Sequence, residues 1–225
     1  MSLYQFLLIS HIAVFGVWFG TDLATFHLSR KVLDTDMSVD TRRVMAGSMM
    51  GVEVLARLAL PTMLALGLCL SIETGYLDLA RWWQVVFALA ASGWVAMVWT
   101  IHRSGGGELG TRLAGFDLGV RSVICAVLWV VGLWSAFTVD GPFLGEWLGA
   151  KVTLFALIMT CGIAIRFMLR PFAPAFAALV SDGSSPEREA IMAGSIRRAR
   201  PVVVVIWASL LSATALAVTQ NVPWA

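Results

Sequence analysis

Charged residues are scarce in this chain. Asp, Glu, Lys and Arg make up 13% of its 225 residues, against about 25% in soluble globular domains. Only three cysteines are present, each in an apolar stretch, and none has the C-x-x-C or C-x-x-C-H spacing of a thiolate metal site or a covalent haem. The net charge of +2 is far from the basic balance that nucleic-acid-binding proteins usually have. These shortages argue against an ordinary soluble domain, a thiolate metal site and a nucleic-acid partner.

The N-terminal segment also lacks the features of a removable signal peptide. It reads M-S-L-Y-Q-F-L-L-I-S-H, without a basic n-region and without a small-residue cleavage site. We therefore expect the first apolar segment to be retained in the protein.

Hydrophobic residues, in contrast, are abundant and continuous. They make up 59% of the chain, and several runs reach the roughly 20 residues that a helix needs to cross a bilayer. The alternating pattern of a membrane β-barrel is missing, so the backbone has to be satisfied within helices. The sequence predicts an all-α, polytopic transmembrane helix bundle that forms a single domain, 1–225. Its six spans are expected at about 3–26, 49–72, 82–101, 119–138, 147–168 and 201–219.

Basic residues are concentrated in alternate connections between these spans. By the positive-inside rule the first, third and fifth connections are cytoplasmic, which places both termini on the outer, periplasmic side of a bacterial inner membrane. The fifth connection, about 171–200, is expected to hold a short helix that starts at Pro186 after Ser185. Several tryptophans fall near the predicted outer ends, where indole rings favour the interface: Trp82, Trp83, Trp147 and Trp224.

The chain contains an internal repeat. Glu53-x-x-x-Arg57 in the second span recurs as Asp117-x-x-x-Arg121 in the fourth, 64 positions later, and similar glycine and tryptophan echoes follow downstream. Both copies start on the same side of the predicted membrane. We therefore expect parallel, duplicated helical hairpins rather than an inverted repeat.

Ionisable residues inside the predicted spans are the candidates for function, because such groups are costly in a bilayer unless they are paired or solvated. On the first span, His11, Trp18 and Asp22 return to one helix face at 100° per residue. A purely structural interpretation is equally open: His11 would bond to a neighbouring helix and Asp22 would form an ion pair.

The two acid-x-x-x-Arg pairs have the i,i+4 spacing at which a carboxylate and a guanidinium meet along a helix. Together with Asp22, the acids of these pairs, Glu53 and Asp117, are interpreted as a buried charge network. A structural role is favoured for the two pairs. The alternative is that Arg57 and Arg121 form a cationic pocket for a carboxylate-bearing ligand. Lys151, at a depth similar to that of His11, either extends to the membrane surface or belongs to the same site.

Three segments resemble two related families of membrane proteins. The first span, S-H-I-A-V-F-G-V-W-F-G-T-D from Ser10 to Asp22, and the second, A-R-L-A-L-P-T-M-L-A-L-G-L from Ala56 to Leu68, are similar to the HemJ-type protoporphyrinogen oxidases. The fourth and fifth spans, with V-V-G-L-W, G-E-W-L-G-A-K-V-T-L and A-I-R-F-M-L-R-P, resemble the CopD copper-resistance domain. The chain departs from both patterns: it is longer than the four-span HemJ-type proteins, and Ile165-Arg166 stands where the copper family has Asn-Arg.

The resemblance implies a haem b held between the spans. His11 matches the first-span histidine that serves as an axial iron ligand, and Lys151 matches a lysine of the same families. Such a site needs an imidazole, apolar walls and cations for the propionates. Trp18 would belong to the wall, and Arg57 and Arg121 would supply the cations. No second axial ligand is identifiable.

Three functions follow as competing hypotheses. The leading one is a haem-b-binding membrane oxidoreductase or electron-transfer protein, acting on a porphyrin or coupled to quinone or a redox partner. The second is copper or proton-coupled transport, with Asp22, Glu53 and Asp117 as a relay. The third is a membrane anchor for a redox partner. The sequence specifies neither the catalytic residues nor the oligomeric state, which leaves a homo-oligomer open.

Overall fold

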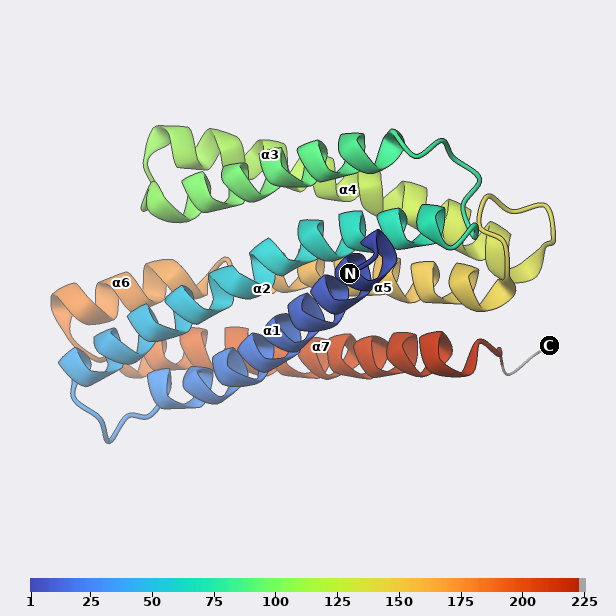
Figure 1. The fold of residues 1–225 in the computed structure, drawn as a ribbon. Helices are drawn as coiled ribbons and strands as arrows, with labels where there is room; N and C mark the ends of the chain where they lie inside the picture. Colours follow the sequence, from blue (N-terminus) through green and yellow to red (C-terminus); the bar gives the residue numbers. More distant parts are fainter. Residues whose placement is uncertain (223–225) are drawn as a thin grey trace.

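The computed structural model describes residues 1–222, where seven α-helices are joined by short connections (Figure 1). The predicted position of Trp224 lies outside the described residues. Six of the helices are long and apolar enough to cross a membrane, which confirms an all-α, multi-pass membrane protein. The helices are α1 (Leu3–Val32), α2 (Val39–Glu73), α3 (Trp83–Arg103), α4 (Glu108–Phe137), α5 (Glu146–Met168), α6 (Phe172–Asp182) and α7 (Pro186–Thr219).

Local sequence signals set several helix starts. Ser2 caps α1 in a capping box with Gln5, and Ser38 caps α2. Ser185 accepts a hydrogen bond from the backbone N–H of Arg188, and Pro186 occupies the first turn of α7. Polar side chains at these positions satisfy backbone donors that the helix itself leaves free.

The helices are longer than the apolar runs predicted from hydropathy, and the fifth connection differs from its prediction. The helix that starts at Pro186 was expected to be short, but it continues through Pro201 to Thr219 as one helix with the sixth span. The short helix of this connection is instead α6, which follows Pro171 directly. Proline removes one backbone donor, and neighbouring groups in a membrane bundle can compensate for it. Hydropathy detects only the apolar part of such a helix.

The bundle has two distinct ends (Figure 1). At one end lie the α1–α2 connection, α6 and the start of α7, and this is where most arginines fall; we call it the basic end. At the other end, the connections after α2 and α4 meet. There the backbone N–H of Leu144 donates to the Tyr76 carbonyl over 2.7 Å, and Leu77 forms an isolated bridge with Phe143. The outer location of the termini and the duplication of the hairpins stay predictions.

The helices α4 and α5 pack with their backbones close together. A Cβ atom added at Gly132 would lie 2.8 Å from the Thr153 nitrogen, and one added at Gly149 would collide with the backbone of Ala136. Small residues of this kind allow membrane helices to approach closely. The largest hydrophobic cluster joins residues of α1, α2, α3, α4, α5 and α7 and includes Trp18.

Candidate functional site

His11 on α1 is partly buried and makes no hydrogen bond with any described residue. Its Nδ1 atom is buried and has no partner among the described residues. On the α2 side, a Cβ atom added at Gly67 would lie 3.6 Å from His11 Cε1, so the ring rests against a gap that glycine leaves in α2. On the α5 side, Lys151 is close enough for its ammonium to interact electrostatically with the imidazole. His11 and Lys151, on two different helices, therefore interact electrostatically.

Trp18 forms an apolar wall on the same face of α1. It is 4% exposed, and its ring meets Phe155 of α5 edge to face, with centroids 6.0 Å apart. Seven residues separate it from His11, which places it two turns away on one face. Lys151 and Phe155 share the i,i+4 spacing on α5. The interior between α1 and α5 thus combines an imidazole, an ammonium and aromatic surface.

Asp22 lies further along this face of α1, beside α2. Its carboxylate interacts electrostatically with Glu53, and Glu53 accepts a hydrogen bond from Arg57 Nε. The predicted i,i+4 pair of Glu53 and Arg57 is therefore confirmed. The Arg57 side chain is 51% exposed, so part of its guanidinium stays free of the pair.

Asp117 is the centre of a second charge network. Its carboxylate accepts hydrogen bonds from more side chains than that of Glu53 does. Arg121 Nε donates to both carboxylate oxygens, at 3.0 and 2.9 Å, which confirms the second i,i+4 pair. Trp94 Nε1 on α3 donates to Oδ1 over 2.8 Å, and the Arg121 guanidinium stacks on the Trp94 ring. Arg166 on α5 donates to Oδ2 over 3.1 Å and also to the Ala114 carbonyl. One carboxylate thus joins three helices and neutralises only one of two arginines.

Sequence reasoning missed two members of this network. The sequence analysis names Arg166 only as a departure from the pattern of the copper family, and it does not name Trp94. A signal for Arg166 did exist, because it falls inside the predicted fifth span, where an unpaired cation is costly. Nothing in the spacing indicated Trp94. The two arginines expected to form a common cationic pocket, Arg57 and Arg121, belong to separate ion pairs on α2 and α4.

No group of three or more His, Cys, Asp or Glu side chains that could hold a metal ion occurs within residues 1–222. A haem iron does not require such a group, because the porphyrin supplies four ligands and the protein one or two. No protein-family model, curated protein or solved structure matches this chain. The arguments for function therefore rest on the residues and their geometry.

Proposed function

We propose that this protein is a haem-b-binding integral membrane oxidoreductase or electron-transfer protein. The observation that carries the proposal is the partly buried His11 imidazole, whose Nδ1 atom is buried without a hydrogen-bond partner, next to Gly67 of α2 and in electrostatic interaction with Lys151 of α5. Leaving a buried polar atom unsatisfied costs about 1–3 kcal/mol. An iron bond at the imidazole is the type of interaction that offsets such a cost in a haem protein.

The residues around His11 fit a haem better than a free ion. Trp18 and Phe155 provide aromatic surface against a macrocycle. Lys151, which makes no hydrogen bond or ion pair with any described residue, and the free part of Arg57 are cations available to propionates. Arg121 is less available, because it is engaged by Asp117. When bound, a haem supplies one-electron chemistry, and the protein holds, orients and shields it. A porphyrin or quinone substrate, or a redox partner protein, fits this function.

The test is a reduced-minus-oxidised visible spectrum with a pyridine haemochrome assay on the purified full-length protein, expressed with adequate haem supply. We expect a stoichiometric haem b signal that is lost in His11→Ala. The matched control is His27→Ala, since His27 lies on the same helix but is exposed. A colourless, folded wild type would contradict the proposal, as would equal haem content in both variants.

Proton-coupled transport is the second candidate, and the juxtaposition of Asp22 with Glu53 favours it. Carboxylates on neighbouring membrane helices that interact electrostatically are candidates for a proton path. Proton flux in liposomes that is lost in Asp22→Asn, measured on protein without any chromophore, would support transport over redox chemistry. Copper transport and the role of a membrane anchor have no comparable observation in their favour.

A further inference from the structure

Arg200 on α7 differs from every other arginine that is not exposed. Four such arginines each pair with a carboxylate: Arg42, Arg121, Arg166 and Arg188. Arg200 is half-buried, its Nε is buried without a hydrogen-bond partner, and it forms no ion pair with any described residue. A guanidinium in this condition is normally paired, because a buried charge without a counterion is costly.

A second arginine, Arg30 on α1, is exposed and contacts the same aromatic ring as Arg200. The guanidinium carbons of Arg200 and of Arg30 on α1 each lie 5.4 Å from the centroid of the same Phe26 ring. Arg30 also lacks a carboxylate partner among the described residues. One aromatic ring offsets only part of the repulsion between two cations. Two guanidiniums without a carboxylate partner favour the binding of an anion with several acceptor oxygens.

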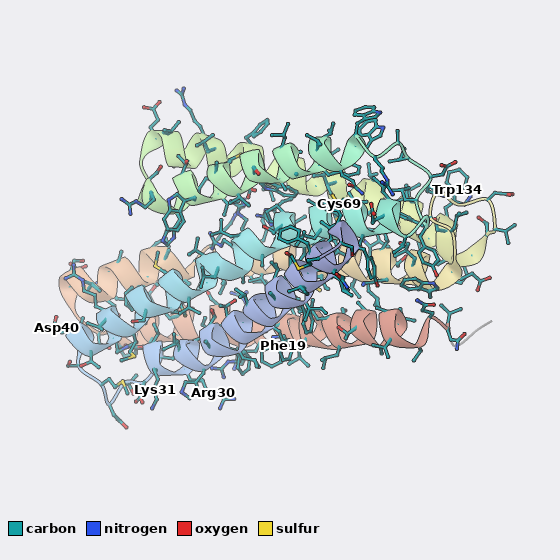
Figure 2. The ribbon with its side chains drawn as sticks, in the orientation of Figure 1. Phe19, Arg30, Lys31, Asp40, Cys69 and Trp134 are labelled. Atoms are coloured by element: carbon teal, nitrogen blue, oxygen red, sulfur yellow. The ribbon has the colours of Figure 1, made fainter. Side chains whose placement is uncertain are left out.

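Aromatic rings line the contact between α1 and α7, from Phe26 away from the basic end. The Phe26 and Trp207 centroids are 5.1 Å apart, Phe19 meets Trp207 at 6.3 Å, and Phe15 stacks on Phe19 at 6.0 Å. Trp207 Nε1 is also buried without a partner. Figure 2 shows Phe19 along α1 and Arg30 nearer the basic end. The cations therefore lie toward the basic end, and the apolar rings lie deeper.

The position of the arginines along the helices indicates the source of the anion. Arg200 immediately precedes the apolar run that starts at Pro201, and Arg30 is in the last turn of α1. Both residues therefore lie where the hydrocarbon layer gives way to the lipid headgroups. Basic pockets between helices at this depth bind anionic lipids.

We propose that Arg30 and Arg200 bind the phosphate of an anionic membrane phospholipid, with an acyl chain along Phe19, Phe26 and Trp207. The inference does not depend on haem binding. Its ligand is distinguished from a haem propionate by repeating the measurement on the His11→Ala variant, which retains both arginines.

The test is lipid retention by the purified full-length protein, measured by native mass spectrometry after transfer from vesicles of phosphatidylglycerol and phosphatidylcholine. We expect wild type to retain phosphatidylglycerol preferentially, and Arg200→Gln to retain it about tenfold less, the size of one charge-assisted hydrogen bond. Arg197→Gln is the control, because it removes the same charge from an exposed position one turn earlier on α7. It should behave as wild type, as should His11→Ala.

Several outcomes would overturn the proposal: no lipid preference in wild type, equal retention in Arg200→Gln and wild type, or equal loss in Arg197→Gln. A gain of phosphatidylglycerol retention in His11→Ala over wild type would reassign the arginines to a haem propionate, because losing the haem would free them for lipid. Inorganic phosphate that stabilises wild type against heat as well as phosphatidylglycerol does would reject a lipid source. Arg30→Gln and Trp207→Phe give the same readout if Arg200→Gln does not fold; retention at the wild-type level in both would count against the site.

Discussion

Arg166 of α5 donates a hydrogen bond to Asp117 of α4 over 3.1 Å. The carboxylate of Asp117 therefore connects two helices in addition to forming the i,i+4 pair with Arg121 along α4. Trp94 adds α3 to the same network. An interaction of this kind has consequences for stability that a pair on one helix does not have.

Replacing Asp117 by Asn should destabilise the protein strongly. The change leaves two arginines without their counterion, and breaking a buried pair from one side costs about 3–5 kcal/mol. The measurement is the free energy of unfolding in detergent, or Tm where unfolding is irreversible. Glu108→Gln is the control, since Glu108 forms an i,i+4 pair with Arg112 on the same helix but at an exposed position. Its effect should be small. Equal effects of the two substitutions would show that the network does not stabilise the bundle.

The charge pair at the basic end should behave similarly. Arg42, whose side chain is 2% exposed, donates to both oxygens of Glu189 at 2.7 and 2.8 Å and to the Val32 carbonyl. Glu189→Gln leaves this guanidinium buried without its carboxylate, which we expect to cost about 3 kcal/mol. Hydrogen exchange should also become faster in α6 and in the turn before α7, because Ser184 donates to the same carboxylate.

Glu187→Gln is the matched control for this pair, because Glu187 is exposed and has no hydrogen bond or ion pair with any described residue. Unchanged exchange in α6 after Glu189→Gln would contradict a role for this pair in holding the basic end together.

The close packing of α4 and α5 gives a third prediction. Gly149→Ala would push a methyl group into the backbone of Ala136, and overpacking of this kind costs about 1–3 kcal/mol. Gly162→Ala on the same helix meets nothing within 4 Å and should leave stability unchanged or raise it by up to about 1 kcal/mol, because alanine is the better helix former. Thermal unfolding of both variants checks the difference. If Gly149→Ala is as stable as Gly162→Ala, α4 and α5 do not approach this closely.

Much of the fold could be predicted from the sequence, because it depends on interactions along the chain. Hydropathy predicted six spans, and i,i+4 spacing predicted the pairs of Glu53 with Arg57 and of Asp117 with Arg121. Helix periodicity placed His11, Trp18 and Asp22 on one face, and none of the three is exposed.

The interactions that could not be predicted connect residues far apart in the sequence. Arg42 meets Glu189 across 147 positions, and Arg166 meets Asp117 across 49. Neither partner choice follows from local spacing, since each depends on which helices become neighbours. The stacking of Arg30 and Arg200 on Phe26 is of the same kind.

The gap in α2 beside His11 allows the proposed haem site to be tested without changing a ligand. A Cβ atom at Gly67 would make ordinary van der Waals contact with the imidazole, at 3.6 Å, so Gly67→Ala should be tolerated. The branched side chain of Gly67→Leu extends further and should displace the ring, which we expect to lower haem content severalfold while His11 stays present. Gly51→Leu, on the same helix with nothing within 4 Å, is the control. Haem content per folded protein, measured by pyridine haemochrome, should fall in the order Gly51→Leu, Gly67→Ala, Gly67→Leu. A Gly67→Leu protein that is folded and fully loaded would place the haem iron away from His11, because a displaced imidazole could not keep an unchanged axial bond.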